Sequence, residues 1–286
     1  MTSSPIVNID RLGVSFATDA GPVKAVDDIS LRVERGEVLA IVGESGSGKT
    51  VTAKTILGLL PETATASGAV ILANREGTRE HDVISLDLAR LREIRGTDVA
   101  MVFQEPSTAL NPVYTVGWQI MEGLRAHGAV SKQEARAKAI DVLRRVGIPD
   151  PEERVDHYPH QFSGGQKQRI VIAMALVLDP GLIVADEPTT ALDVTVQAEI
   201  LDLLRTLRDE TGTAIVLITH NMGVVADLAD RVAVMYQGSV VEQADARTLF
   251  SAPQEAYTKQ LLAAVPYVGH GVAKAAERAA QRPAGW

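Results

Sequence analysis

Residues 43–50, with the sequence GESGSGKT, constrain the fold of this chain more than any other stretch. The apolar residues 38–42 precede them and predict a buried strand, and residues 51–60 follow them and predict a helix that Pro61 ends. The pattern G-x-x-x-x-G-K-[S/T] between a strand and a helix predicts a loop that wraps around a phosphate group. Glycines let the backbone N–H groups turn inward, and the helix N-terminus adds the positive end of its dipole.

The positions of this loop have distinct expected tasks. Lys49 is expected to reach the β- and γ-phosphates of a nucleotide, and the Thr50 hydroxyl is expected to ligate magnesium. The alternative is a flexible loop without a ligand, and the flanking strand and helix disfavour it. The nucleotide-binding residues predicted here are Gly43, Glu44, Ser45, Gly46, Ser47, Gly48, Lys49, Thr50 and Val51.

Composition excludes several other classes of protein. The 286 residues are 46% hydrophobic and 22% charged, which predicts one or two globular domains. A net charge of −8 argues against nucleic acid as the main partner. The chain has no cysteine, which excludes disulfides, thiolate metal sites and iron–sulfur clusters. We expect no signal peptide, and no membrane span because no apolar stretch approaches the required length.

Strands and helices alternate along the rest of the chain. This alternation predicts an α/β fold with a largely parallel sheet, whose ligands lie at the carboxyl ends of the strands. Residues 74–82 are expected to form a hydrophilic loop, and residues 107–161 a helical region in which Ser131 opens one helix with a capping box. The expected strands are 6–16, 23–33 in short pieces, 38–42, 69–73, 99–103, 182–185, 214–219, 231–236 and 239–241; the other expected helices are 88–95, 116–126, 167–178 and 194–210.

Asp186 and Glu187 directly follow the apolar run 182–185. A carboxylate at the end of a buried strand can hold magnesium through water, and this is the task expected of Asp186. Glu187 is placed to polarise the water that attacks a γ-phosphate, because a base must lie within hydrogen-bond reach of that water. The alternative is that both carboxylates only cap the edge of a strand.

Five further side chains have two interpretations each. Gln104 and His220 stand at predicted strand ends, where Gln104 would complete contacts to magnesium and water and His220 would stabilise the γ-phosphate. Taken alone, they are a polar strand end and a structural histidine. Phe16 is either a core aromatic or a platform for an adenine ring. His157, like the nearby His160, is interpreted as a loop residue, because no ligand-like spacing accompanies the pair.

A second glycine-rich segment opens the helix predicted over residues 167–178. It consists of Ser163, Gly164, Gly165 and Gln166. Its N–H groups and the helix dipole predict a second anion site, whereas the alternative is a tight turn before a buried helix. One nucleotide does not need two such sites in one chain. A symmetric pair of chains does, if each second site closes over the γ-phosphate of the other chain.

Taken together, residues 6–250 resemble the ATP-binding subunit of an ABC transporter. Every catalytic position carries the active type of residue, and the resemblance favours adenine stacking for Phe16. The matching positions are 43–50 for the Walker A motif, Gln104 for the Q-loop, 163–166 for the signature, 182–187 for Walker B with a catalytic Glu187, 191–193 for the D-loop and His220 for the switch histidine.

The resemblance implies a P-loop NTPase (RecA-like) α/β core with an antiparallel β subdomain and an inserted α-helical subdomain. The ATPase domain would span residues 5–250, with its core at 5–104 and 163–250 and the helical subdomain at 105–162, and residues 251–286 would form a short extension. The cofactors would be ATP and Mg2+. The implied catalytic residues are Lys49, Gln104, Glu187 and His220, the implied magnesium ligands are Thr50, Gln104 and Asp186, and the implied additional ATP contacts are Phe16, Ser163, Gly164, Gly165, Gln166 and Asp193.

A narrower resemblance is to the dipeptide, oligopeptide and nickel importers of that family. Residues 104–112 look like their segment after the Q-loop, and residues 252–262 look like their C-terminal motif, with Glu255 and Ala256 where His-Pro is usual. It implies an ATPase on the cytoplasmic face of the membrane that energises uptake of peptides or a similar small solute. The implied partners are two membrane permease subunits, a second ABC ATPase that is a copy or a paralogue, and an extracytoplasmic solute-binding protein.

Two rival functions have sequence signatures that can be checked. A soluble ABC ATPase of DNA repair inserts a long coiled coil or zinc modules before the signature, but here only 114 residues (163 − 49) separate Lys49 from Ser163, without heptads or cysteines. The translation type carries two cassettes in one chain, and this chain has one. A non-catalytic nucleotide-binding module is disfavoured by Glu187 and His220.

Overall fold

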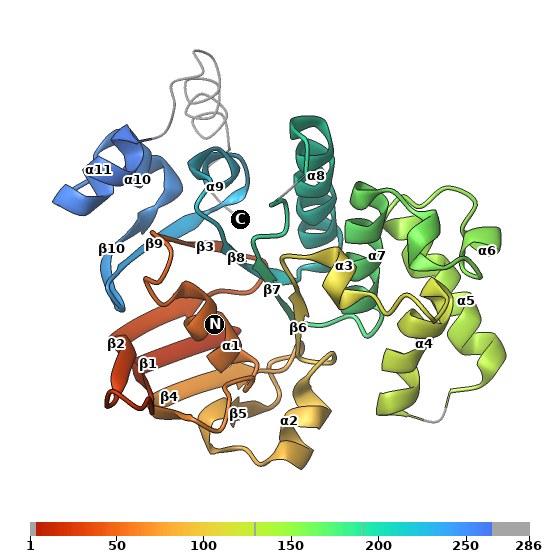
Figure 1. Cartoon of the computed structure of the whole chain (residues 1–286), viewed down its shortest axis with the longest axis horizontal. Coiled ribbons are helices and arrows are strands. Elements are labelled where there is room, and N and C mark those ends of the chain that lie inside the picture. The colour runs from red at the N-terminus through yellow and green to blue at the C-terminus, as the bar shows by residue number, and fades with distance from the viewer. Residues whose placement is uncertain (1–3, 129, 191, 265–286) are drawn as a thin grey trace. The chain divides into compact units, whose positions relative to one another are not determined.

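The computed structural model describes residues 4–128, 130–190 and 192–264. These residues form two compact units. The first unit combines the chain up to Leu86 with the chain from Ala214 onward, and the second unit is Asp87–Thr213. Each unit is described by itself below, with the element labels of Figure 1.

The first unit contains an antiparallel sheet in the order β2-β1-β4-β5 (Figure 1). Its strands are β1 (Val7–Phe16), β2 (Val23–Val33), β4 (Ala64–Ala73) and β5 (Glu80–Asp82). Apolar side chains alternate along β1 and are buried, because one face of such a sheet packs on the core while the other meets water. The short helix η1 (Val83–Ser85) follows β5.

The same unit contains the strands that carry the glycine-rich loop. β3 (Val38–Val42) pairs in parallel with β8 (Ala214–Ile218) and with β9 (Arg231–Tyr236), and β10 (Ser239–Asp245) pairs antiparallel with β9. Every residue of β3 and β8 is buried, as expected for parallel strands covered on both faces. The helices of this unit are α1 (Lys49–Ile56), α9 (Met222–Leu228), α10 (Ala246–Ser251) and α11 (Ala256–Ala263).

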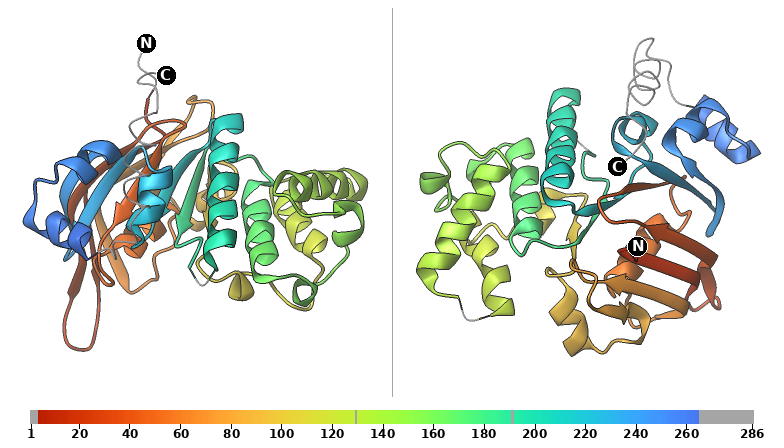
Figure 2. Two further views of the ribbon diagram at one scale, coloured as in Figure 1. Left: turned by 90° about the horizontal axis from the view of Figure 1, so that it is seen from above. Right: turned by 180° about the vertical axis from the view of Figure 1, so that it is seen from behind.

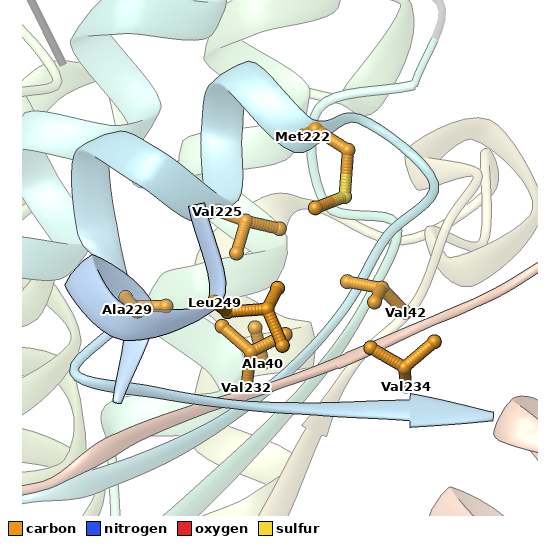
Figure 3. Close-up of a cluster of buried hydrophobic side chains, with 9 residues drawn as sticks. Ala40, Val42, Met222, Val225, Ala229, Val232, Val234 and Leu249 are labelled. Atoms are coloured by element: carbon orange, nitrogen blue, oxygen red, sulfur yellow. The ribbon is translucent and has the colours of Figure 1, made fainter. Parts of the chain in front are cut away.

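One hydrophobic cluster ties the C-terminal helices to these strands. Figure 3 shows Ala40, Val42, Val225 and Leu249 among its members, which come from β3, α9 and α10. Partly buried side chains of α11 pack against the same cluster. Figure 2 shows α10 and α11, in blue, beside β9 and β10 of this unit. The segment after residue 251 is therefore part of the first unit as far as it is described.

The second unit carries two parallel strands, β6 (Val99–Val102) and β7 (Leu182–Asp186), which pair from Val99 with Leu182 to Val102 with Ala185. Its longer helices α4, α5 and α7 pack against one another (Figure 1). The helices of this unit are α2 (Leu88–Ile94), α3 (Pro106–Ala109), α4 (Val116–His127), α5 (Lys132–Arg145), α6 (Pro151–Arg154), η2 (Pro159–Gln161), α7 (Gly164–Leu176) and α8 (Val194–Thr211).

The predicted capping box of α5 is confirmed. Ser131 Oγ accepts the Glu134 N–H at 3.2 Å, and the Glu134 carboxylate accepts the Ser131 N–H at 3.1 Å. The predicted apolar face is buried as well, and Ala135, Ala139 and Leu143 have no exposed surface. The parallel pairings of β3 and of β6 likewise confirm the predicted α/β class with a largely parallel sheet.

Three local predictions are wrong. Residues 74–82 are not all loop, because Glu80–Asp82 form β5 against β4. β4 begins at Ala64 rather than at residue 69, so that Gly68 lies within the strand. Helix α1 ends at Ile56 rather than at residue 60, since Gly58 adopts φ 63 and turns the chain before Pro61. Among the described residues, no helix combines the length and the apolar character that crossing a membrane requires.

Candidate nucleotide site

The turn between β3 and α1 is built by glycines in conformations that other residues rarely adopt. Gly43 has φ 150, Gly46 has φ 80 and Gly48 has φ 100. A Cβ atom at Gly43 would lie 2.1 Å from the Met235 carbonyl oxygen, and one at Gly48 would lie 2.6 Å from the Ala25 carbonyl oxygen. The loop therefore needs glycine at these two positions for space as well as for conformation.

The buried Lys49 side chain donates hydrogen bonds to the backbone of this loop. Lys49 is the first residue of α1, it is 7% exposed, and its Nζ donates to the carbonyl oxygens of Gly43 at 2.8 Å and Glu44 at 2.6 Å. The Ser47 hydroxyl is buried beside it at 3.4 Å. The ammonium group is thus held over the loop, next to the N-terminus of α1, where positive charge from the backbone N–H groups also gathers. Such a concave, positively polarised loop fits a phosphate group.

Two other predicted residues belong to the first unit. His220 follows β8 and is exposed, just before Asn221 caps the N-terminus of α9 with its side chain. Because β8 runs parallel to β3, His220 and the glycine-rich loop both follow the carboxyl ends of neighbouring strands. Phe16 ends β1, opposite Val23 and Ala64, and is half-buried there. It is therefore neither in the fully buried core nor fully exposed.

In the second unit, parallel pairing of β6 with β7 brings Gln104 to Glu187. The Gln104 Nε2 donates to Glu187 Oε2 at 3.1 Å. Thr190 donates its hydroxyl to the same carboxylate oxygen at 2.8 Å. Two donors on one carboxylate oxygen fix the orientation of the side chain. Glu187 itself has φ 48, a left-handed conformation that is uncommon for a non-glycine residue and tends to occur at functional sites.

Asp186 is the last residue of β7 and is 8% exposed, so its carboxylate lies at the carboxyl end of a buried strand as predicted. Among the described residues, no group of three or more His, Cys, Asp or Glu side chains is arranged so that it could hold a metal ion by itself. A Mg2+ ion with a nucleotide commonly uses one or two protein oxygens together with phosphate oxygens. Within the second unit, the Asp186 carboxylate offers oxygen donors of the kind that such an ion uses.

The second glycine-rich segment forms the start of α7. Ser163 is its N-cap, its Oγ accepts the Gln166 N–H at 3.3 Å, and the Gln166 side chain accepts the Ser163 N–H at 3.1 Å. This capping box was not predicted, although the S-x-x-Q pattern signals it, and it uses N–H groups that the sequence analysis assigned to an anion. A Cβ at Gly165 would lie 2.5 Å from a methyl group of Val196, so glycine lets α7 approach α8 closely.

Asp193 caps the neighbouring helix α8, where its Oδ1 accepts the Val196 N–H at 3.0 Å. Residue 191, the first of the predicted 191–193 motif, lies outside the described residues. His157 packs edge-on against Phe162 at 6.1 Å between ring centroids, and His160 stacks on Tyr158. These two histidines thus make ring contacts within the loop that leads to α7.

Two side chains near the predicted sites were missed by the sequence analysis. Thr190 contacts Glu187 as described, and its position three residues after the carboxylate was the available signal. Tyr257 on α11 accepts the Glu44 N–H at 3.1 Å, across 213 positions in the chain. Nothing in the local sequence indicates that second contact.

Comparison with known proteins agrees with this geometry. A family model described as ABC transporter matches residues 26–190. The dipeptide transport ATP-binding protein DppD of Bacillus subtilis is 49% identical over 263 residues, which cover 91% of this chain and 77% of that protein. A putative peptide import ATP-binding protein of Brucella melitensis is 48% identical over 271 residues, which cover 94% of this chain and 80% of that protein.

Solved structures of ABC transporter cassettes are also similar to this chain. The ATP-binding cassette MJ0796, described as a dimer in a post-hydrolysis state bound to ADP and Pi, aligns with a TM-score of 0.72 and 29% identity over 84% of this chain and 98% of its own. The cbiO1 protein of Clostridium perfringens, part of the ABC transporter complex cbiONQ, aligns with the same score and identity over 93% of this chain and 98% of its own. The chain therefore belongs to the ABC transporter family, in which it is an ATP-binding subunit with ATPase activity.

Proposed function

We propose that this ATPase energises the uptake of peptides, or of a similar small solute, through separate membrane permease subunits. The observation that carries the substrate class is the 49% identity to a dipeptide transport ATP-binding protein over 91% of the chain. The segments 104–112 and 252–262 point the same way, because they resemble peptide importers rather than the family at large.

The nucleotide would be held by the first unit through the loop between β3 and α1. Lys49 would neutralise the β- and γ-phosphates, and the N–H groups of the loop would complete the contacts. Phe16 would stack on the adenine ring, since it is a half-buried aromatic at a strand end. The buried lysine and the glycine conformations support the phosphate-binding part of this proposal.

Hydrolysis would depend on side chains at the ends of β7, β6 and β8. Glu187 would orient and deprotonate the attacking water, and Gln104 would hold its carboxylate in place through the 3.1 Å hydrogen bond. His220 would stabilise charge on the γ-phosphate. Phosphoryl transfer requires positioning and charge stabilisation more than covalent chemistry, and these groups supply both.

A magnesium ion would supply charge neutralisation between the phosphates when bound. Its protein ligands would be Thr50, Asp186 and Gln104, which present the oxygen donors that this hard cation prefers. The remaining positions in its coordination sphere would belong to phosphate oxygens and water.

Two ATPase chains would act as a head-to-tail pair. Ser163, Gly164, Gly165 and Gln166 of one chain would face the nucleotide held by the other, with Asp193 at the same interface. The dimer reported for MJ0796 supports this arrangement. Residues 105–162 would contact the permease subunits at the cytoplasmic face of the membrane, and an extracytoplasmic binding protein would deliver the solute. The second ATPase would be a copy of this chain or a paralogue.

A capture experiment tests the importer role. We would tag the Glu187→Gln protein, add Mg-ATP to native membranes, solubilise them gently and identify the co-purifying chains by mass spectrometry. Two permease chains with an extracytoplasmic binding protein are the expected result, and the ligand of that binding protein then identifies the substrate. Lys49→Ala is the matched control, since it should not bind ATP and should not trap the closed pair.

The contrary result is equally specific. Recovery of DNA-repair factors or ribosomes, with no membrane protein, would overturn the importer role in favour of a soluble ABC ATPase. Recovery of permeases with a binding protein that binds no peptide would keep the transporter and overturn the substrate class.

A further inference from the structure

We infer that Tyr257, on the C-terminal helix α11, is a positioning residue for the phosphate loop: its hydroxyl oxygen holds the Glu44 N–H and fixes the Gly43–Glu44 peptide in the orientation that ATP binding requires. The inference rests on ATP binding at this loop and does not depend on the importer role or its substrate. Both residues of this contact belong to the first unit.

The contact is made to one particular peptide group. Its N–H, on Glu44, donates to Tyr257 Oη at 3.1 Å. Its carbonyl, on Gly43, accepts from Lys49 Nζ at 2.8 Å. The two ends of a planar peptide point in opposite directions, so Tyr257 and Lys49 hold it from opposite sides. A flip of this peptide would break both hydrogen bonds and remove one of the carbonyl oxygens that hold the Lys49 ammonium group.

Such a flip turns ψ of Gly43 together with φ of Glu44. Gly43, which adopts φ 150, has no Cβ atom to restrict its share of that rotation. The hydrogen bond from the Glu44 N–H to Tyr257 therefore fixes the orientation of a peptide group that the local backbone would not fix by itself. Burial raises the pKa of the Tyr257 hydroxyl, the hydrogen bond from the Glu44 N–H lowers it, and the Glu44 carboxylate raises it again. The net pKa lies above its ordinary value, so the group stays neutral and protonated at neutral pH.

Tyr257 is itself held rigidly. Its ring packs against Tyr236, at the end of β9, with 4.3 Å between centroids and a 38° angle between the planes. The same side chain, with Leu261 and Leu262 of α11, packs on the hydrophobic cluster that includes Val42 of β3. The hydroxyl is thus positioned from the same core that positions the strand leading into the loop.

The start of α11 is fastened separately. Both carboxylate oxygens of Glu242, on β10, accept backbone N–H groups there, from Gln254 at 2.8 Å and from Glu255 at 3.0 Å. Lys259 closes the same turn by donating to the Gln254 carbonyl at 2.8 Å. Glu242 therefore holds the start of α11, and Tyr257 on the same helix contacts the phosphate loop. Together these contacts connect the C-terminal extension to the nucleotide site.

The full-length Tyr257→Phe variant tests this inference, because it removes the hydroxyl and keeps the ring. Tyr236→Phe is the matched control, since it removes the other hydroxyl of the same aromatic pair, whose partner is the adjacent Gln237 side chain at 3.2 Å. The Kd for ATP, the KM and kcat of ATP hydrolysis, and the thermal midpoint are compared for both variants. Amide exchange of the Glu44 N–H is measured by mass spectrometry or NMR without nucleotide.

For Tyr257→Phe we expect the Kd and KM for ATP to rise about fivefold, the ratio that loss of one hydrogen bond produces, with kcat nearly unchanged. Exchange at Glu44 should accelerate, and the thermal midpoint should stay close to that of the wild type. Tyr236→Phe should change neither ATP affinity nor exchange at Glu44. Unchanged affinity with Tyr257→Phe, or an equal loss with both variants, would overturn the inference, and neither result bears on the importer role.

Discussion

Gln104 Nε2 lies 3.1 Å from Glu187 Oε2 and donates a hydrogen bond to it, which joins the ends of the parallel strands β6 and β7. The Glu187 backbone has φ 48, so its side chain leaves the strand end in a direction that a regular extended residue would not give. The same oxygen also accepts the Thr190 hydroxyl. The Gln104 amide and the Thr190 hydroxyl therefore both help to orient the proposed base.

Glu187→Gln is expected to lower kcat for ATP hydrolysis by at least about 100-fold, the usual contribution of a positioned general base. Its Kd for ATP should stay within about twofold, because the amide keeps the shape of the side chain and still accepts hydrogen bonds. Steady-state turnover and equilibrium nucleotide binding measure the two effects. Glu210→Gln, an exposed change on α8, is the control and should behave as the wild type does. Wild-type turnover by Glu187→Gln would remove Glu187 from the mechanism.

Thr190 offers a test of how the base is oriented. Thr190→Val keeps the shape of the side chain but removes the donor that lies 2.8 Å from Glu187, and we expect kcat to fall about three- to tenfold. Thr190→Ser keeps the hydroxyl and should retain most of the activity. ATP affinity should be unaffected in both variants. Equal rates for the valine and serine variants would show that the hydroxyl has no part in positioning Glu187.

Two glycines of the phosphate loop should respond differently to the same substitution. Gly43→Ala places a Cβ 2.1 Å from the Met235 carbonyl oxygen, so the loop must move, and we expect destabilisation of about 1–3 kcal/mol with loss of ATP binding. Gly46→Ala meets nothing within 4 Å and should cost only about 1 kcal/mol for its φ of 80. Thermal unfolding without nucleotide compares the two variants. A larger loss for Gly46→Ala would contradict the described packing.

The docking of α11 should depend on pH through Glu242. Burial of this carboxyl raises its pKa, but the N–H groups of Gln254 and Glu255 and the charge of Lys259 outweigh that effect, so the pKa lies below its ordinary value. A group with a lowered pKa in the folded state stabilises that state above its unfolded pKa, and the contribution disappears as the pH falls through the folded value.

We therefore expect the Gln254 and Glu255 amide resonances to stay constant from pH 7 down to about pH 5 and to shift only in more acidic solution. An NMR titration measures this directly. Glu242→Gln is the control, because it removes the titrating group and should abolish the transition. A transition of the same size in that variant would assign the pH dependence to another group.

Much of the fold could be predicted because its signals are local. The strand before Gly43, the helix after Lys49 and the capping box at Ser131 are each encoded within a few residues, and the structure contains all three. The parallel pairings followed from the alternation of apolar strands with helices. The positions of Gln104 and Asp186 at strand ends followed as well, because parallel strands present their carboxyl ends at one edge.

Other features depended on contacts between distant segments. β5 is a polar stretch of three residues, and it becomes a strand only because β4 offers it an edge to pair with. Such edge pairing depends on which strand lies nearest after folding, and propensity does not encode that. The capping box at the start of α7 is a different case: the local S-x-x-Q pattern signals it, and the Ser163 and Gln166 side chains use part of the N–H groups that were expected to face an anion.

The sequence by itself determined the phosphate loop, the strand–helix order and the identity of the side chains that can carry ATP chemistry. Only the tertiary structure decided how those side chains are held: Gln104 on Glu187 across 83 positions, and Tyr257 on the backbone of Glu44 across 213 positions. The physical reason is the range of the interactions. A glycine turn or a helix cap is settled within one turn of chain, whereas a hydrogen bond between α11 and the loop requires that the hydrophobic core first bring both to the same place.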